Sequence, residues 1–213
     1  LSRIDFKGKR FTYNPNPQVL TGEIEKLTNY SQRKRNLEIK KKLFEDKEDE
    51  KSLKELEKLE QLYTLGNVNF DSVLIIDFGN NLKSVLTSLV YTDVDQKKVL
   101  FTTVNQWFDE SIFYENTIKT LYYPSINYKE FKRYNEKYFA KFSSYPNEIT
   151  ILTYDALGLI YYSWKKNGDI NSINNFSFKN KIKGKIGTFS FKDRKVTQDL
   201  DIYKVENKKF IKF

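Results

Sequence analysis

The stretch of residues 70–89 most constrains the fold, because it predicts a strand, a turn and a helix in succession. Residues 73–76 form an unbroken apolar run that is too short for a helix and rich in β-branched side chains, which is typical of a strand covered on both faces. Gly79, Asn80 and Asn81 then predict a turn and a helix N-cap, and apolar residues recur at helical spacing up to Leu89. We therefore expect an α/β fold with a mostly parallel sheet flanked by helices.

Polar and aromatic side chains follow two predicted strands directly. Asp77 and Phe78 follow the first strand, and a second strand at 98–104 is followed by Asn105, Gln106 and Trp107. Because the carboxyl ends of parallel strands are where ligands bind in such sheets, we expect these five residues to line one crevice. The turn lacks the glycine spacing of a phosphate-binding loop, which argues against a nucleotide site.

The composition excludes several kinds of chemistry. The chain has no His and no Cys, so serine-histidine and cysteine-histidine catalysis, disulfides and thiolate metal sites are impossible within it. A Ser-Lys hydrolase and a carboxylate hydrolase, with Asp77 and Asp109 as its first candidates, stay open as alternatives. We expect a non-enzymatic protein without a cofactor or metal, since Asp199 and Asp201 on one strand face are too few ligands for a cation.

The net charge of +9 comes mainly from the C-terminal region, where residues 165–213 carry 13 basic and 5 acidic side chains. We interpret these lysines as solvated surface residues and expect no nucleic-acid partner, although a basic nucleic-acid-binding domain stays open as an alternative. No apolar run reaches the roughly 20 residues of a membrane-spanning helix, so we expect no transmembrane segment here. The chain begins at Leu1 without an initiator Met, so we expect a removed leader or a fragment.

The N-terminal part predicts a helical hairpin within residues 20–65. A short strand at 10–13 is expected before a proline-rich break, and a long helix then runs from Leu20 to about residue 44. An acidic turn separates it from a second helix at 53–62. We favour a helix lying on a sheet with an elongated insertion; the alternative is a coiled-coil arm that docks on another protein.

The C-terminal part predicts a strand at 121–124, an amphipathic helix at 128–142 whose aromatic stripe faces the core, and an apolar helix at 149–164. Within the apolar helix, Asp155 either caps an adjacent backbone, which we favour, or lines a cleft. From residue 183 onward we expect an antiparallel meander with strands at 189–191, 201–205 and 210–213.

The order of these motifs resembles the C-terminal portion of a type I periplasmic-binding protein. The resemblance covers nearly the whole chain and is nearest to the penicillin-binding-protein activators, which are related to leucine-binding proteins. It rests on the proline-rich break, the charged hairpin, Thr64-Leu65-Gly66, the segments 70–74 and 105–109, the helix at 131–142, Tyr154-Asp155-Ala156 and the segment 184–191.

The resemblance implies two α/β lobes with a ligand in the cleft between them. Residues 1–120 would form the second lobe with the hairpin, residues 121–182 the returning strand and helices of the first lobe, and residues 183–213 strands that return to the second lobe. Most of the first lobe would precede Leu1. Phe78 and Asn105 match the family's ligand-contacting positions, but amino-acid-binding relatives have a carboxylate where this chain has Asn105, which argues against an amino acid as the ligand.

These expectations define the leading hypothesis. The chain would belong to a periplasmic or envelope protein, exported or lipid-anchored, that binds an amino-acid or cell-wall-derived solute, regulates a peptidoglycan synthase through its hairpin, or does both. The alternative within the same family is the substrate-binding component of an amino-acid ABC transporter.

Overall fold

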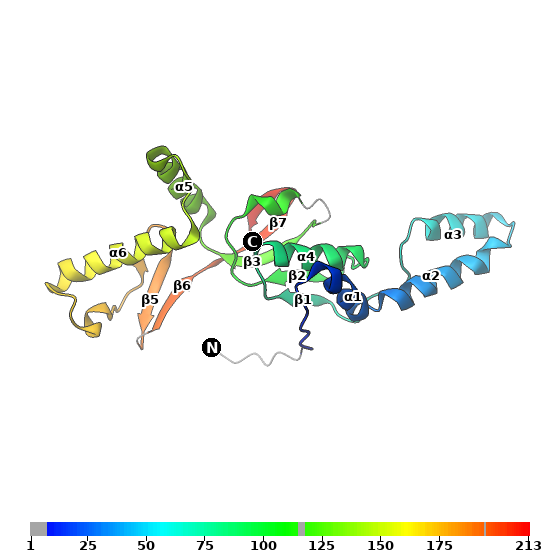
Figure 1. The fold of residues 1–213 in the computed structure, drawn as a ribbon, viewed down its shortest axis with the longest axis horizontal. Coiled ribbons are helices and arrows are strands. Elements are labelled where there is room, and N and C mark those ends of the chain that lie inside the picture. Colours follow the sequence, from blue (N-terminus) through cyan, green and yellow to red (C-terminus); the bar gives the residue numbers. More distant parts are fainter. Residues whose placement is uncertain (1–7, 115–117, 194) are drawn as a thin grey trace. The chain divides into compact units, whose positions relative to one another are not determined.

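The computed structural model describes residues 8–114, 118–193 and 195–213. The described chain is a mixed α/β structure with six α-helices and eight strands (Figure 1). Five strands form a mixed sheet in the order β1-β2-β3-β7-β8, and three form an antiparallel sheet in the order β4-β5-β6. The chain divides into two compact units, of which unit 1 covers the described residues up to Phe101 together with Ile118, and unit 2 covers the rest.

In unit 1 the expected long helix is two helices, α1 (Pro17–Leu27) and α2 (Tyr30–Glu45). Pro17 occupies the first helical position, where its missing N–H costs nothing, and the Asn16 side chain accepts a hydrogen bond from Gln18 N at 3.0 Å. The prediction of one helix was wrong because Asn29 adopts a left-handed conformation (φ 52°), which interrupts the helical hydrogen bonding between α1 and α2.

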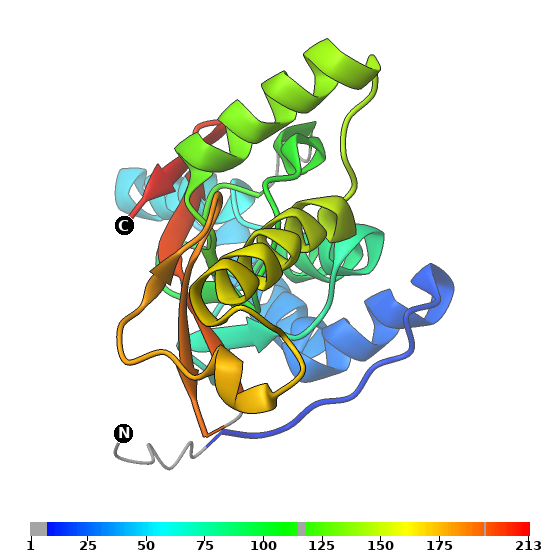
Figure 2. The same cartoon turned by 90° about the vertical axis from the view of Figure 1, so that its left-hand side faces the viewer.

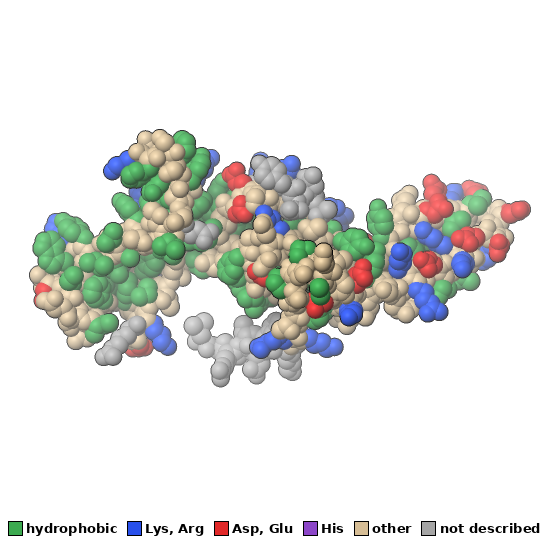
Figure 3. Space-filling model, in the orientation of Figure 1, with side chains coloured by type: hydrophobic (Ala, Val, Ile, Leu, Met, Phe, Trp, Pro, Cys, Tyr) green, Lys and Arg blue, Asp and Glu red, His purple; other side chains and the backbone are tan. Residues whose placement is uncertain are grey.

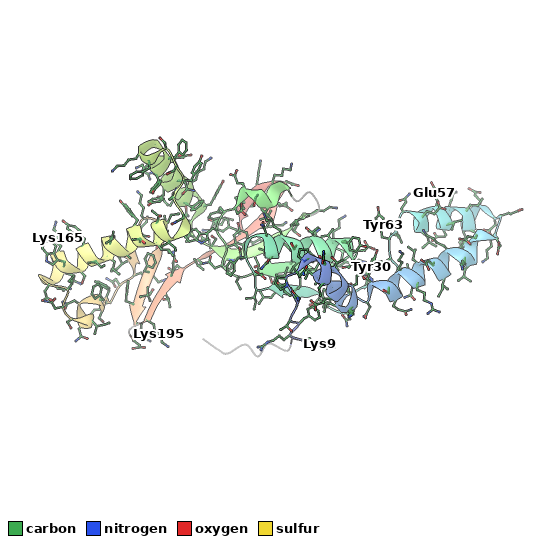
Figure 4. The ribbon with its side chains drawn as sticks, viewed as in Figure 1. Lys9, Tyr30, Glu57, Tyr63, Lys165 and Lys195 are labelled. Carbon is green, nitrogen blue, oxygen red and sulfur yellow. The ribbon has the colours of Figure 1, made fainter. Side chains whose placement is uncertain are left out.

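The predicted helical hairpin is confirmed. Helix α2 packs beside α3 (Glu50–Glu60), which begins where the Asp49 carboxylate accepts a hydrogen bond from Ser52 N at 2.9 Å. Tyr30 and Tyr63 mark the base of the hairpin, and Glu57 lies on the outer side of α3 (Figure 4). Acidic and basic side chains are interspersed over the face of the hairpin seen in Figure 3.

A buried guanidinium fixes the base of the hairpin. Arg33 Nε donates to Gly66 O at 3.1 Å, Nη1 to Thr92 O at 3.0 Å, and Nη2 to Asp93 O and Thr64 Oγ1, both at 2.8 Å. Thr64 Oγ1 in turn donates to the Asp93 carboxylate at 2.5 Å. Burial lowers the pKa of Arg33, and the nearby Asp93 carboxylate partly offsets this effect. One side chain therefore joins α2 to the segments that follow α3 and α4.

The predicted strand-turn-helix is present as β1 (Ser72–Ile75) and α4 (Gly79–Tyr91). Helix α4 packs on α1, and Leu20, Ile24, Leu86 and Leu89 are buried in unit 1. The expectation that the strand is covered on both faces was wrong, because Leu74 and Ile76 are 51% and 71% exposed.

The strand predicted at residues 10–13 was also wrong, since residues 8–16 form neither helix nor strand. Side chains rather than a strand ladder hold this segment. Tyr13 Oη donates to the Asp77 carboxylate, and Asn14 N donates to the Glu23 carboxylate at 2.8 Å.

In unit 2 the sheet is mixed rather than mostly parallel. Strand β3 (Leu121–Ser125) pairs parallel with β2 (Leu100–Thr103) and antiparallel with β7 (Asp201–Glu206), and β7 pairs antiparallel with β8 (Lys209–Lys212). The predicted strands at 98–104 and 121–124 are thus confirmed. The returning C-terminal hairpin, joined antiparallel to β3, accounts for the difference from the expected sheet.

An aromatic cluster forms the core of unit 2. The Phe108 ring lies 4.7 Å from Tyr128, 4.9 Å from Tyr203 and 5.2 Å from Phe210, measured between ring centroids. Phe108 comes shortly before the 3₁₀ helix η1 (Glu110–Tyr114). Burial raises the pKa of Tyr123, which adjoins this cluster.

The helices of unit 2 occupy the predicted positions. Helix α5 (Tyr128–Phe142) has the predicted bounds, and its aromatic stripe is only partly core, because Tyr134 is buried whereas Phe139 and Phe142 are exposed. Helix α6 (Glu148–Asn167) extends slightly beyond the expected apolar helix and is followed by the 3₁₀ helix η2 (Ile173–Phe176).

The predicted single meander is divided between two sheets. Strands β4 (Ile182–Lys183), β5 (Thr188–Lys192) and β6 (Lys195–Asp199) form an antiparallel sheet beside α6, whereas β7 and β8 join β3 (Figure 1 and Figure 2). Within the described residues, no helix combines the length and apolar character needed to span a bilayer.

Replacing Arg33 with Lys should loosen the hairpin base. A lysine keeps the charge but has no planar fork to reach acceptors on three segments, so the free energy of unfolding should fall by about 2 kcal/mol. Urea unfolding followed by circular dichroism at 222 nm measures the loss. The exposed Arg35→Lys on the same helix is the control and should change stability by less than about 0.5 kcal/mol; equal effects of the two changes would contradict the assignment.

Candidate functional site

The first group of predicted site residues lies in unit 1. Asp77 follows β1, and its carboxylate accepts hydrogen bonds from Phe78 N at 2.8 Å and from Tyr13 Oη. The Phe78 ring is 58% exposed just before α4 begins. Asp77 is therefore held in place by its neighbours, while Phe78 presents an apolar ring to solvent.

Tyr13 is a residue that the sequence reasoning missed at this site. Burial, followed by the hydrogen bond to Asp77 and the negative charge of that carboxylate, raises the pKa of Tyr13. The phenol therefore keeps its proton at neutral pH and remains a donor to Asp77. No local pattern indicates this contact, because 64 positions separate the two residues in the chain.

The second group lies in unit 2, after β2. Asn105 is exposed. The Gln106 backbone is tied to β3, since its N–H donates to Pro124 O at 3.3 Å and its carbonyl accepts from Ser125 Oγ at 2.6 Å. The half-buried Trp107 ring lies 6.0 Å from the Phe131 ring between centroids, so this residue packs against α5.

The local environments thus separate residues that are available to a ligand from residues that serve structure. Phe78 and Asn105 are exposed, whereas Asp77, Gln106 and Trp107 have structural partners within their own units. Asp109, considered as a hydrolase carboxylate, caps the start of η1 by accepting from Ser111 N at 2.9 Å and Ser111 Oγ at 2.5 Å. The crevice shared by the two groups stays a prediction.

A separate groove lies within unit 2, between α6 and the β4-β5-β6 sheet. Its volume is about 770 Å³, and most of its lining is apolar. Helix α6 contributes Leu152 and Leu159, among others, and the sheet contributes Ile182, Phe189 and Phe191. Lys181, Lys183 and Lys185 line the same groove.

Asp155 of α6 both caps a backbone and lines this groove, so the favoured prediction of capping is confirmed. Its two carboxylate oxygens accept hydrogen bonds from Lys185 N at 2.5 Å and Ile186 N at 3.1 Å. Gly184 is packed so closely that a Cβ atom there would lie 2.6 Å from Asp155 Oδ2. The Gly184-Lys185-Ile186-Gly187 segment is therefore a turn clamped by a carboxylate, closed by a hydrogen bond from Gly184 N to Gly187 O at 2.7 Å.

The groove-lining lysines and phenylalanines were not predicted as site residues. Lysines alternate along 181–185 and phenylalanines along 189–191, which is the period of a strand with unlike faces. That alternation could have identified the apolar face, on which Ile182 and Phe189 pair, whereas Lys183 pairs with Thr188 on the opposite face.

Candidate metal ligands are scarce in the described ranges. No group of three or more carboxylates there is arranged to hold a metal ion. Asp199 and Asp201 lie on different strands, contrary to the expectation of one shared face, and they pair with Lys181 at 2.7 Å and Lys212 at 2.8 Å.

No family model matches the chain, and no curated protein matches it significantly.

The tie between Tyr13 and Asp77 predicts a loss of stability at alkaline pH. The pKa of Tyr13 is raised in the folded chain from an ordinary value of 10.0. The unfolded chain therefore releases this proton first, and the free energy of unfolding should fall as pH rises above about 10. Urea unfolding between pH 8 and pH 11 measures the fall, which should be smaller in Tyr13→Phe.

The exposed Tyr63→Phe is the control for this experiment and should show the full alkaline decline. Tyr123, whose pKa burial also raises, contributes equally in all three proteins. An unchanged decline in Tyr13→Phe would show that the phenol does not stabilise the folded chain through Asp77.

Proposed function

We propose that this chain is part of a non-catalytic envelope protein of type I periplasmic-binding fold that recognises a small solute through residues after β1 and β2. In this proposal, Phe78 packs on an apolar part of the ligand and Asn105 hydrogen-bonds a neutral polar group. Asp77, Gln106 and Trp107 hold these two side chains in position. A cell-wall-derived solute suits an uncharged Asn105 better than a free amino acid does.

The observation that carries this proposal is the exposure of an aromatic and an amide side chain directly after two strands. Phe78 is 58% exposed and Asn105 is exposed, while the residues beside them are held by hydrogen bonds or ring packing. A rigid frame with a few presented groups is what a binding site requires, because little ordering remains to oppose binding.

The exposed apolar side chains of α6 support the proposal that this chain is part of a larger two-lobed fold. Asp155, Leu159 and Ser163 of this helix face the sheet and η2, yet the side opposite them also carries apolar side chains, since Leu157 and Trp164 are 61% and 52% exposed. Apolar side chains gather over this helix (Figure 3). A helix of this kind is typical of the interior of a larger structure, and we propose that the remainder of a first lobe covers it.

Isothermal titration tests the ligand part of the proposal. The full-length protein should bind a muropeptide or a neutral amino acid with measurable heat, and Asn105→Ala should weaken binding at least tenfold through the lost hydrogen bond. The control is Asn67→Ala, the same change at an exposed asparagine of unit 1, which should leave binding unchanged. Absence of heat with all muropeptides and amino acids would remove small-solute binding, and heat with amino acids alone would favour a transporter component.

The hairpin supports the second part of the proposal, regulation of a peptidoglycan synthase. Ile39 and Leu43, one helical turn apart on α2, are exposed, whereas Leu37 is buried. They give a mostly charged arm a small apolar contact surface, such as a helical partner could cover.

Shortening the hairpin tests that contact. Deletion of residues 40–56 removes the tip and leaves Arg33 and its acceptors, so unit 1 should stay folded while co-purification with a synthase weakens. Ile39→Ser with Leu43→Ser should reproduce the loss, and the exposed Leu53→Ser on α3 is the control. Unchanged recovery of the synthase with the shortened chain would contradict a docking role.

A further inference from the structure

We propose that the outer edge of β6 pairs antiparallel with the same edge of a second copy of this chain, which joins two three-stranded sheets into one sheet of six strands. The contact lies wholly within unit 2. It does not depend on the solute site proposed for the residues after β1 and β2.

The outer edge of β6 is open to another strand. Among the described residues, β6 pairs with β5 alone and ends the sheet order β4-β5-β6 (Figure 1). Its side chains are accessible, since Val196 is 59% exposed and Lys195 and Thr197 are exposed as well. A five-residue edge with unpaired N–H and C=O groups is a template for pairing with a strand of another molecule.

The hairpin of β5 and β6 determines which backbone groups point to that edge. Two residues separate the strands, and Lys195 pairs with the last residue of β5, so this closing pair is hydrogen-bonded. Hydrogen-bonded pairs alternate along an antiparallel ladder, so Thr197 and Asp199 also direct their backbone groups toward β5. The backbone N–H and C=O groups of Val196 and Gln198 therefore point outward.

These outward groups specify the register between two copies. When Val196 of one copy lies opposite Gln198 of the other, each such pair can exchange two hydrogen bonds, and the twofold axis passes through Thr197. In that register Lys195 lies directly opposite Asp199 of the second copy, and the contact occurs twice. Opposite charges placed across an antiparallel pair stabilise it, whereas like charges destabilise it. The strand is thus complementary to itself.

The two charged side chains lie on the face that this pairing requires. Lys195 and Asp199 are four residues apart, and the register with β5 places Asp199 opposite Thr188, on the polar face of the sheet. Asp199 accepts from Lys181 at 2.7 Å and keeps half of its side chain exposed. Within the described part of the chain, no salt bridge engages Lys195. A second copy would supply its counter-ion.

Other strands suit this contact less well. The opposite edge of the same sheet is β4, whose two residues are too short a ladder for strand addition. Self-pairing of β8 along its full length would place Lys209 opposite Lys212 of the second copy, which like charges oppose. A foreign strand at β6 would need an acidic residue opposite Lys195 and a basic residue opposite Asp199. The chain itself provides that order.

Sedimentation velocity of the 213-residue chain tests the inference. The dimer fraction should rise with protein concentration into the high micromolar range and fall with added salt, because the paired charges are partly exposed. Lys195→Asp or Asp199→Lys alone places like charges opposite each other and should weaken self-association at least about tenfold. Lys137→Asp, a charge reversal on the exposed surface of α5, is the control and should associate as the parent does.

Recombining the two reversals tests the register itself. An equimolar mixture of Lys195→Asp and Asp199→Lys chains restores opposite charges at both contacts, and so does the double variant. Each should associate within about threefold of the parent, since the backbone pairing is unchanged. Circular dichroism of every variant shows that the chain remains folded.

Cross-linking at the twofold axis provides an independent measurement. Directly opposed residues of a pair without hydrogen bonds have Cα atoms about 4.5 Å apart, which a disulfide can span. The chain has no Cys, so Thr197→Cys introduces a single thiol. Mild oxidation should convert this variant to a disulfide-linked dimer at least about tenfold faster than Thr12→Cys, the same change at an exposed position of unit 1.

Several results would overturn the inference. A parent chain that stays monomeric at every concentration would remove the interface. Association unaffected by Lys195→Asp and Asp199→Lys would place the contact elsewhere on the molecule. Loss in both single variants without recovery in their mixture would contradict antiparallel self-pairing, and equal oxidation rates of Thr197→Cys and Thr12→Cys would contradict an axis at Thr197.

Discussion

The carboxylate of Asp155 holds together the elements from which the groove is built. It is a charged group in the middle of an apolar helix, where an unpaired ion would be costly, and two backbone N–H groups from the Gly184–Gly187 turn compensate that cost. In satisfying the carboxylate, the chain fixes β4 and β5 at a set distance from α6. The groove and the glycine at Gly184 both follow from this one contact.

In unit 1 a buried charged side chain also joins separate segments through hydrogen bonds, but here the group is a cation, the guanidinium of Arg33. The hairpin of α2 and α3 buries few apolar side chains, so hydrophobic packing alone would hold its base weakly. Arg33 compensates by donating to acceptors on the segments after α3 and α4, which a planar guanidinium can reach at once. Both units therefore rely on a buried ionic group whose partners are mostly backbone atoms. Such contacts demand a specific geometry and so favour one arrangement of loops over alternatives that would bury the same apolar surface.

Much of the fold could be predicted from the sequence because the relevant signals are local. The aromatic spacing of α5, the acidic break between α2 and α3, and the apolar runs of β1 to β3 each determine an element within a few residues of its bounds. The errors concern features that depend on distant partners: the lack of a strand at 10–13, the exposure of β1 and the division of the C-terminal strands between two sheets. At the candidate sites, the capping role of Asp155 was predictable from a polar residue in an apolar helix. The tie between Tyr13 and Asp77 was not, because nothing in either segment indicates the other.

The positions of the two tryptophans make intrinsic fluorescence a probe of one unit of the chain. Trp107 packs against Phe131, Trp164 lies on the exposed side of α6, and the chain has no other indole. Both belong to unit 2, so intrinsic indole emission reports on that unit alone, whereas the far-ultraviolet signal of α1 to α4 comes from unit 1. A single sample observed at two wavelengths can therefore show whether the halves of the chain melt as one cooperative body or as two.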